Sequence, residues 1–376
     1  MNFFVKCVCP SCFAEINLGE CRILSRRTSG KVLKNPSKNP LARLNVEPLD
    51  GPYYTTELAC RECYECKYLL PSNIERVPSI ILVVVGDVAS GKSHYLASFI
   101  HQLKTEWINN ATGFVSFECL TPDVENDYIN NYFEPLFVHQ KALALTSRGT
   151  SPYARPLIYE LAVAQSPRHP VTSTNLMIYD TSGEDYEAED RLVNFARFVL
   201  NTTAFIFAVN PVAIDAVFRN LDPALKARPQ LQAQYTQGRK RRLAERLNAI
   251  MSIYGRFHGH AKGSRLHQTP VAVMVSKSDL LPHTSTVMHA PYYGGGVDLQ
   301  DIATIDEEVR NLLQQYYAQG DLIASTSRLA KVKFFATSAT GGPPDAYDNF
   351  THVKPLRCLD PVLWILHELG IIRATK

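Results

Sequence analysis

The chain has 376 residues, a formal net charge of +3, 45% hydrophobic residues and 20% charged residues. This balance is typical of a folded globular protein and excludes a disordered chain. It also excludes a protein that binds nucleic acid or an anionic membrane through its overall charge alone.

The hydrophobic pattern contains no membrane span and no secretory signal. No apolar run approaches the roughly 20 residues that a spanning helix needs, and the first ten residues lack the apolar region of a signal peptide. We therefore expect a cytoplasmic protein with no transmembrane segment. In such a reducing compartment, clustered cysteines favour metal binding over disulfides.

Cysteines are concentrated near the start of the chain, where seven of the nine precede residue 67. Residues 9–12, 60–63 and 63–66 each form a CxxC pair, the spacing with which two thiolates reach one metal ion. We predict a zinc-ribbon-like module over residues 1–75 that binds Zn²⁺ through four thiolates. The candidate ligands are Cys9, Cys12, Cys60, Cys63 and Cys66. Cys60 and Cys66 are alternatives for the fourth position, and Cys7 and Cys21 are left for a second, incomplete site.

A basic run lies between the cysteine pairs. Seven Lys or Arg residues and no acidic residue occur from Arg22 to Arg43. Such a run can contact RNA, DNA or a membrane surface. We expect a solvated loop instead, because the aromatic residues that stack on bases are absent from this stretch.

From about residue 76 to residue 376 the pattern is that of an α/β domain, and we place the boundary in the linker at residues 71–78. Apolar strand-like runs alternate with amphipathic stretches, which predicts a mostly parallel sheet flanked by helices. The predicted strands span residues 80–85, 113–119, 157–164, 175–179, 204–209, 271–275 and 332–336. The predicted helices span residues 93–108, 185–200, 230–255, 302–318 and 361–369. Long insertions are expected near residues 120–155 and 211–268, and the second must contain extra helices.

A phosphate-binding loop directly follows the first of these strands. Residues 86–93 read GDVASGKS and match GxxxxGK[ST], with a β-branched strand before them and an amphipathic stretch after them. Glycines let the backbone amides surround an anion, and the helix N-terminus adds its positive dipole end. We expect contacts to the nucleotide from Gly86, Asp87, Ala89, Ser90, Gly91, Lys92, Ser93 and His94. Lys92 is expected to act in catalysis at the β- and γ-phosphates, and the Ser93 hydroxyl to ligate Mg²⁺.

A DxxG sequence, DTSG at residues 180–183, ends a later strand. An aspartate at the carboxyl end of a strand beside the phosphate loop can hold Mg²⁺ through water. We assign this role to Asp180. Gly183 can approach the γ-phosphate because it has no side chain.

Two further elements indicate guanine. SKSD at residues 276–279 resembles [N/T]KxD, in which an aspartate accepts hydrogen bonds from groups that adenine does not offer. Ser276 replaces the usual asparagine, Lys277 is expected to pack along the base, and Asp279 to read it. TSA at residues 337–339 resembles the SA element, so Ser338 and Ala339 complete the predicted base site.

In this order the four elements resemble the TRAFAC class of P-loop GTPases over residues 78–372. The resemblance implies a P-loop NTPase G domain that binds GTP or GDP with Mg²⁺. It also implies a switch threonine, for which Thr150 is the candidate and Ser151 and Thr146 are alternatives. Glu184 stands where many such proteins have a water-orienting glutamine. A carboxylate there adds negative charge near the γ-phosphate, so we expect slow hydrolysis.

The cysteine module joined to this domain, with CPSCF near its start and DTSGED in the switch region, is similar to the bacterial double-GTPase-like family. That resemblance implies a regulatory GTPase with protein partners in a defence or conflict system. The alternatives are a GTP-binding scaffold that does not hydrolyse, a zinc-ribbon nucleic-acid binder with a regulatory G domain, and a small-molecule kinase, against which SKSD counts. We favour the regulatory GTPase, which acts as a nucleotide-controlled switch.

Overall fold

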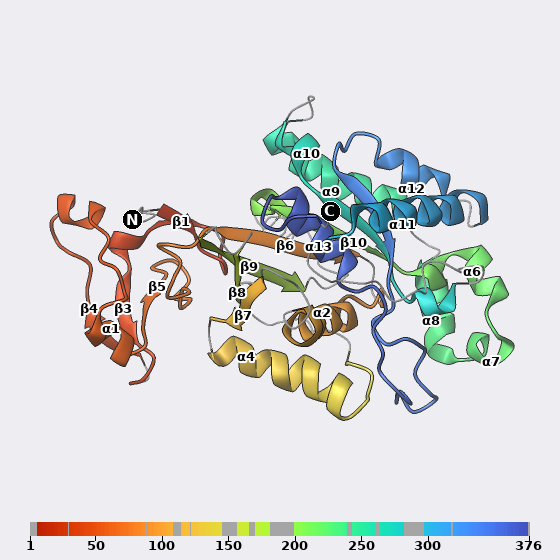
Figure 1. Cartoon of the computed structure of the whole chain (residues 1–376), viewed down its shortest axis with the longest axis horizontal. Helices are drawn as coiled ribbons and strands as arrows, with labels where there is room; N and C mark the ends of the chain where they lie inside the picture. Colours follow the sequence, from red (N-terminus) through yellow and green to blue (C-terminus); the bar gives the residue numbers. More distant parts are fainter. Residues whose placement is uncertain are drawn as a thin grey trace.

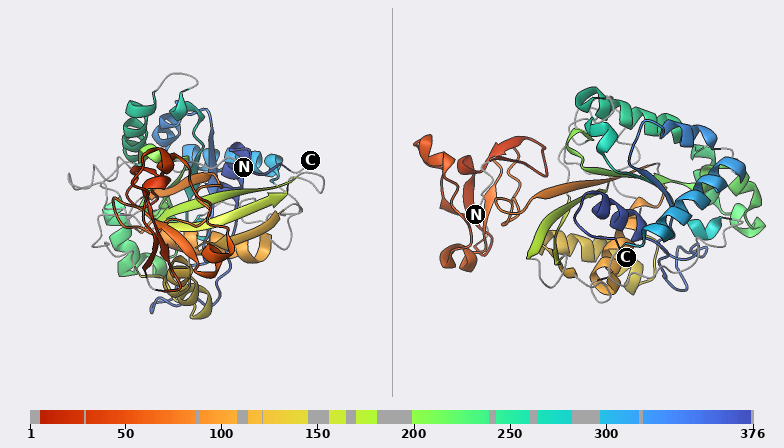
Figure 2. Two further views of the ribbon diagram at one scale, coloured as in Figure 1. Left: turned by 90° about the vertical axis from the view of Figure 1, so that its left-hand side faces the viewer. Right: turned by 45° about the horizontal axis from the view of Figure 1, so that its top comes forward.

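The computed structural model shows a large α/β body with a smaller, cysteine-containing module at one end (Figures 1 and 2). The described residues are 6–28, 30–86, 89–107, 114–120, 122–144, 156–164, 170–180, 199–238, 243–259, 264–281, 297–316 and 319–374. Among the helices of this described part, none has both the length and the apolar character needed to cross a membrane.

A seven-stranded sheet forms the centre of the α/β body, in the order β12-β11-β10-β6-β9-β8-β7. Its strands are β6 (Ser79–Gly86), β7 (Phe114–Cys119), β8 (Leu157–Ala164), β9 (Val171–Asp180), β10 (Ala204–Val209), β11 (Val271–Val275) and β12 (Val332–Ala336). The first five in spatial order are parallel, β8 is antiparallel to β9, and β7 is antiparallel to β8. The predicted strands and the mostly parallel sheet are confirmed.

The central strands are continuous apolar runs because helices cover the sheet on both sides. Every residue of β10 and of β11 is buried, as expected for parallel strands packed on two faces. On one face, side chains of α2 (Lys92–Gln102) and α13 (Asp360–Glu368) join the core. On the other, α9 (Leu243–His258) and α12 (Gly320–Ser325) do so. The α/β class is confirmed, and the finer assignment to a P-loop GTPase fold stays a prediction.

Both insertions contain helices. Residues 211–268 hold α6 (Asp215–Asn220), α7 (Pro223–Lys226), α8 (Pro229–Gly238), α9 and α10 (Arg265–Gln268). Residues 120–155 hold α4 (Pro122–Tyr128), which continues as the π-helical segment η4 (Ile129–Val138). The single helix predicted over residues 230–255 is therefore described as α8 and α9, with residues 239–242 outside the description.

The helix predicted over residues 361–369 is confirmed as α13, and the other three agree in part. Residues 93–108 form α2 and a π-helical turn over Leu103–Trp107, and residues 302–318 form α11 (Leu299–Asn311) with a similar turn over Leu312–Tyr316. The helix predicted over residues 185–200 falls largely on residues outside the description.

The N-terminal module consists of a hairpin and a small antiparallel sheet. The hairpin is β1 (Lys6–Val8) with β2 (Glu15–Asn17), and the sheet has the order β4-β3-β5, from β3 (Arg22–Ser25), β4 (Lys31–Lys34) and β5 (Ala59–Glu62). Short helical turns η1 (Leu18–Glu20), η2 (Leu41–Leu44) and α1 (Pro52–Thr56) connect them.

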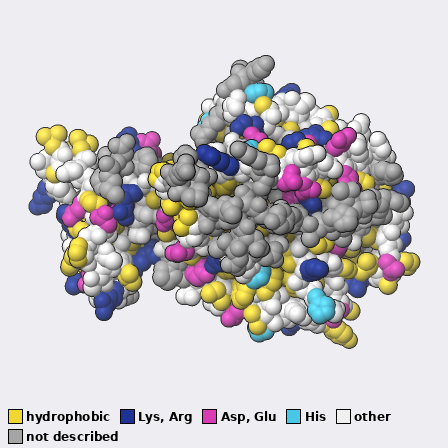
Figure 3. All heavy atoms as spheres, viewed as in Figure 1, with side chains coloured by type: hydrophobic (Ala, Val, Ile, Leu, Met, Phe, Trp, Pro, Cys, Tyr) yellow, Lys and Arg dark blue, Asp and Glu magenta, His cyan; other side chains and the backbone are white. Residues whose placement is uncertain are grey.

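The basic run was predicted as a solvated loop, and this is corrected: it contains strands β3 and β4. Three of its cations have acidic partners from outside the run, since Arg22 pairs with Glu62, Lys34 with Glu47 and Arg43 with Glu20. Basic and acidic side chains accordingly lie side by side on this module in Figure 3.

The junction between module and sheet is tightly bonded. The Asn73 amide nitrogen donates hydrogen bonds to Glu160 of β8 and to Asn175 of β9, both at 2.9 Å. The Asn175 amide donates back to Asn73 at 2.9 Å. The predicted linker is therefore anchored on the sheet, while the division of the chain at residue 75 stays a prediction.

Candidate functional site

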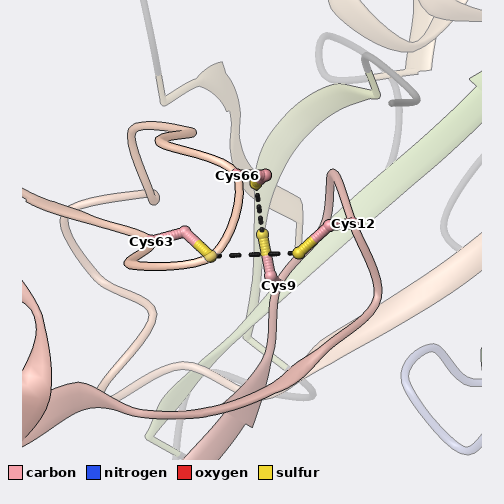
Figure 4. Close-up of side chains that lie close together, drawn as sticks. All are labelled: Cys9, Cys12, Cys63 and Cys66. Atoms are coloured by element: carbon pink, nitrogen blue, oxygen red, sulfur yellow. Dashed lines mark hydrogen bonds between the residues drawn. The ribbon is translucent and has the colours of Figure 1, made fainter. Parts of the chain in front are cut away.

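Four cysteine side chains meet in the module (Figure 4), beside the Pro10 carbonyl to which Tyr179 of β9 donates a hydrogen bond. The sulfur atoms of Cys9, Cys12, Cys63 and Cys66 all lie within 4.8 Å of one another. Cys9 Sγ is 3.7 Å from Cys66 Sγ, and Cys12 Sγ is 3.9 Å from Cys63 Sγ. A disulfide needs about 2.05 Å, whereas Zn–S bonds of about 2.3 Å in a tetrahedron separate the sulfurs by about 3.8 Å. The cluster fits a tetrahedral metal ion.

Two loops of the same construction present these thiols. In the first, the Cys9 amide donates to the Ala14 carbonyl and the Phe13 amide donates to the Cys9 carbonyl, both at 2.9 Å. The loop that begins at Cys63 repeats both bonds, at 2.8 and 2.9 Å. The fifth residue of each loop has a left-handed backbone, with φ of +58° and +65°. The repeated turn aims both sulfurs of each CxxC pair at one point.

This turn decides between the two alternatives for the fourth ligand. Cys66 belongs to the cluster, whereas Cys60 lies in strand β5 and its Sγ donates to the Leu24 carbonyl. In an extended strand, Cys60 and Cys63 do not form the tight loop that brings the sulfurs of a CxxC pair together. Cys7 and Cys21 lie outside the four-sulfur group.

Burial makes the cluster costly to ionise without a cation. It raises the pKa of Cys9 strongly and that of Cys12 to about 11. Burial also acts on Cys66, but hydrogen bonds from the Tyr68 amide and the neighbouring thiols outweigh it and lower its pKa. A bound dication deprotonates coordinating thiols, so the donor set suits Zn²⁺.

The predicted phosphate loop folds around the amino group of Lys92. Lys92 begins α2, and its Nζ donates to the Gly86 carbonyl at 3.1 Å and to Ser90 Oγ at 3.4 Å. Ala89 and Gly91 have φ of +58° and +79°. Left-handed residues of this kind are typical of loops whose amides form an anion-binding nest.

Position 86 requires glycine for a steric reason. Its φ is +151°, and a Cβ built on it would lie 2.3 Å from the Ala208 carbonyl oxygen of β10. Only glycine fits where the loop leaves β6 in contact with the next strand.

Oxygen atoms from α2 and β9 meet beside this loop. Ser93 Oγ donates to Asp180 Oδ2 at 2.6 Å, and the Tyr132 hydroxyl donates to the same oxygen at 3.4 Å. Hydroxyl and carboxylate oxygens are the ligands that Mg²⁺ prefers. Sequence reasoning missed Tyr132, which comes from η4 and carries no motif.

Lys277 joins the predicted base element to the phosphate loop. Its Nζ donates to the Ala89 carbonyl and to Gln234 Oε1 of α8, both at 2.8 Å. Burial, together with the nearby Lys92, lowers the pKa of Lys277 to about 8 against the opposing effect of Asp279. Gln234 was not predicted from the sequence, because it lies in the long insertion.

Asp279 and Ser338 come together from neighbouring strand ends. Ser338 Oγ donates to Asp279 Oδ1, and the Gly341 amide donates to Ser338 Oγ at 2.8 Å. Burial raises the pKa of Asp279. Ala339 also contacts α2, because its carbonyl accepts a hydrogen bond from Ser98 at 2.7 Å.

The Ser276 side chain bonds the SKSD loop to the end of β10. Its hydroxyl donates to the Val209 carbonyl at 3.0 Å. A Cβ built on Gly91 would lie 3.9 Å from Ser276 Cβ and 3.8 Å from Lys277 Cε. The hydrogen bond from Lys277 to Ala89 puts the phosphate loop and SKSD in direct contact.

The His94 side chain contacts residues outside the phosphate loop. Its Nε2 accepts a hydrogen bond from the Leu143 amide at 3.1 Å, and its ring meets Phe350 edge to face. Burial and the Lys277 charge lower the pKa of His94 to about 4, so the ring is neutral at physiological pH. A neutral ring that accepts at Nε2 carries its proton on Nδ1, and His94 thus holds the segment that precedes residue 145.

Four predicted site residues lie outside the described part of the chain: Asp87, Thr150, Gly183 and Glu184. The assignments of the switch threonine and of the water-orienting carboxylate stay predictions. The same holds for the DTSG glycine and its contact with the γ-phosphate.

No protein-family model matches the chain. Over 338 residues the chain is 26% identical to a protein of Mycolicibacterium smegmatis described as "Putative ESX-1 scaffolding and assembly protein SaeC". The alignment covers 82% of this chain and 80% of that protein. The similarity therefore extends over most of both proteins.

Proposed function

We propose that the protein binds GTP with Mg²⁺ in its α/β body, binds Zn²⁺ in its cysteine module, and works as a nucleotide-controlled component of a protein assembly. One observation carries the nucleotide part. Lys92, Asp180 and Asp279, which come from three separate motifs, lie at or shortly after the carboxyl ends of β6, β9 and β11, which run parallel in one sheet. Ligands of open α/β sheets bind at this carboxyl edge.

The contacts around this edge support a single site. Lys277 bonds to the phosphate loop at Ala89, and Ser93 bonds to Asp180. The loop amides and Lys92 suit the phosphates, and Ser93 with Asp180 suits Mg²⁺, which neutralises phosphate charge when bound. Asp279, oriented by Ser338, suits the N1–H and amino group of guanine.

The assembly part rests on a different observation. The relative from Mycolicibacterium smegmatis is described as a scaffolding and assembly protein, and it aligns along most of this chain. Protein partners are therefore proposed for this chain also. The predicted place in a defence or conflict system has no separate support. Nucleic acid is not favoured, because the basic run lacks stacking aromatic residues and three of its seven cations pair with carboxylates.

Hydrolysis is proposed to be slow, so that GTP serves to hold one conformation of the protein until a partner acts. By the resemblance, Glu184 stands in place of a water-orienting glutamine, and a carboxylate there would add negative charge near the γ-phosphate. We expect single-turnover phosphate release well below the roughly 1 s⁻¹ that marks the low end for dedicated enzymes. A scaffold with bound but unhydrolysed GTP is the limiting case of this proposal.

Titration of the zinc-loaded protein with fluorescent GTP and ATP analogues, in the presence of Mg²⁺, tests the proposal. GTP should bind and ATP should not. Asp279→Asn exchanges an acceptor for a donor, so it should lose GTP and gain xanthosine triphosphate. Asp222→Asn is the matched control, because Asp222 caps the N-terminus of α7 and asparagine caps equally well.

Three outcomes are informative. GTP binding with the change of base in Asp279→Asn supports the proposal. Equal or better binding of ATP contradicts the guanine assignment and favours an ATPase or kinase. Failure to bind either nucleotide contradicts a nucleotide function altogether.

A further inference from the structure

We propose that Tyr179 is a positioning residue through which the metal-loaded cysteine cluster holds Asp180 in place for Mg²⁺. The inference rests on the proposed function, since it concerns the same magnesium site. It adds that zinc in the module and Mg²⁺·GTP in the α/β body strengthen each other's binding.

The contact between the two parts is direct. The Tyr179 hydroxyl donates a hydrogen bond of 2.5 Å to the carbonyl of Pro10, which lies between the first two cluster cysteines. The Phe13 ring, from the same loop, lies 5.5 Å from the Tyr179 ring at an angle of 41°. Tyr179 is 2% exposed. One side chain of β9 is thus clamped by the loop that carries Cys9 and Cys12.

The next residue along the strand is Asp180, and consecutive residues of a strand point to opposite faces of a sheet. Tyr179 packs into the core that contains Cys9 and Cys63. On the other side, the Asp180 carboxylate accepts hydrogen bonds from Ser93 of α2 and Tyr132 of η4. Tyr179 and Asp180 are joined by a single peptide unit. A shift of Tyr179 therefore also moves the Asp180 carboxylate that is proposed to hold Mg²⁺.

The end of β9 is a regular part of the sheet. It pairs with β6 as far as Asp180, which is opposite Val84. Tyr179 and Asp180 therefore keep the alternating orientation of strand residues.

The anchor itself depends on the metal. Residues 9–13 form a short loop held by two backbone hydrogen bonds and by the four-sulfur cluster. Metal binding and loop order are coupled in sites of this kind. If zinc leaves, the Pro10 carbonyl loses its fixed position. By linkage, a ligand that favours the fixed position of Asp180 also favours zinc retention.

The test measures the Mg²⁺ dependence of GTP affinity, as the dissociation constant without Mg²⁺ divided by the dissociation constant with Mg²⁺, both in EDTA-free buffer. Zinc-loaded wild type, wild type stripped of zinc by a thiol-selective chelator, and Tyr179→Phe are compared. We expect stripping and Tyr179→Phe each to reduce the ratio about three- to tenfold, the range of one neutral hydrogen bond. Affinity without Mg²⁺ should stay unchanged.

Tyr254→Phe is the matched control. Tyr254 is a buried tyrosine of α9 whose hydroxyl donates to the Thr202 carbonyl at 3.1 Å, away from β9. Its variant should keep the Mg²⁺ ratio of the wild type. In Tyr179→Phe, removal of zinc should cause little further loss, because the link it acts through is already cut.

A second readout follows zinc itself. Release of zinc to a chromophoric chelator should be slower from wild type with Mg²⁺·GTP than without it, and this difference should disappear in Tyr179→Phe. If Tyr179→Phe does not fold, Cys12→Ala provides the test, because it removes a proposed zinc ligand and leaves Tyr179 in place. This variant should also lower the Mg²⁺ ratio.

The inference is overturned if wild type binds Mg²⁺·GTP and its Mg²⁺ ratio is unchanged by stripping and by Tyr179→Phe, a result that leaves the proposed function intact. If zinc-loaded wild type binds no GTP, the proposed function fails and the inference fails with it. The two failures are thus distinguished by the wild-type titration alone.

Discussion

Lys277 Nζ and the Ala89 carbonyl oxygen, 188 residues apart in the chain, form a hydrogen bond of 2.8 Å that ties the base element to the phosphate loop. The bond places a cation with lowered pKa at the meeting point of the two motifs.

The first prediction concerns pH. Burial lowers the pKa of Lys277 to about 8 in the folded protein, below its ordinary value of 10.5. Between about pH 8 and pH 10.5 the folded state therefore binds fewer protons than the unfolded state. The buried charge destabilises the folded state fully below pH 8, and this destabilisation decreases as the pH rises. The free energy of unfolding of wild type, relative to Lys277→Met, should increase from pH 7.5 to pH 10. A flat difference would contradict the lowered pKa.

The second prediction concerns the fourth zinc ligand. Cys66→Ser should lower zinc affinity strongly, because Cys66 Sγ belongs to the cluster. The loss should exceed the roughly 10- to 100-fold seen when a residue that only hydrogen-bonds to a metal ligand is replaced. Cys60→Ser should retain zinc, because Cys60 bonds to Leu24 in β5. Metal content per chain, measured after dialysis, decides between them. Equal loss in both variants would reopen the ligand assignment.

The third prediction concerns Gln234. Its side-chain oxygen accepts a hydrogen bond from Lys277 Nζ and one from the Asn210 amide. Gln234→Ala removes a partner of a charged donor, so GTP affinity should fall about 10-fold, in line with the roughly 1.5–3 kcal/mol of such bonds discounted for partial exposure. Gln232→Ala, whose side chain bonds only to the exposed Lys226 carbonyl among the described contacts, is the control. Unchanged affinity in Gln234→Ala would show that the insertion plays no part in the site.

The fourth prediction concerns the start of the phosphate loop. Gly86→Ala should lower the free energy of unfolding by about 2 kcal/mol or more, because its Cβ would meet the backbone oxygen of Ala208 and its φ is +151°. Gly342→Ala should cost little, because a Cβ at Gly342 has no atom within 4 Å. Urea unfolding of both variants provides the comparison, and equal stability would contradict the close approach of β6 and β10.

The strands could be read from the sequence because a parallel sheet covered on both faces requires unbroken apolar runs. β8, β10, β11 and β12 have the predicted ends, and β9 begins four residues earlier than predicted, in the polar stretch from Val171. Short helices such as α6 and α7 were not located, because a turn or two of helix leaves little periodicity.

Local sequence also determined the phosphate loop and the CxxC pairs, since each is a short turn whose geometry depends on residues a few positions apart. The turn that starts at Gly86 and the loop that starts at Cys9 are of this kind. Spacing could not separate Cys60 from Cys66, because both are three residues from Cys63. The course of the chain decided it, as β5 extends through Cys60 and turns only after Cys63.

The contacts that join these local motifs were decided by the tertiary structure. Tyr179 meets Pro10 across 169 positions, Asp180 meets Tyr132 across 48, and Lys277 meets Gln234 across 43. Such partners carry no pattern in the chain, because each depends on where separate strands and insertions pack. The sequence by itself thus determined which chemical groups the protein has, and folding decided which of them act together.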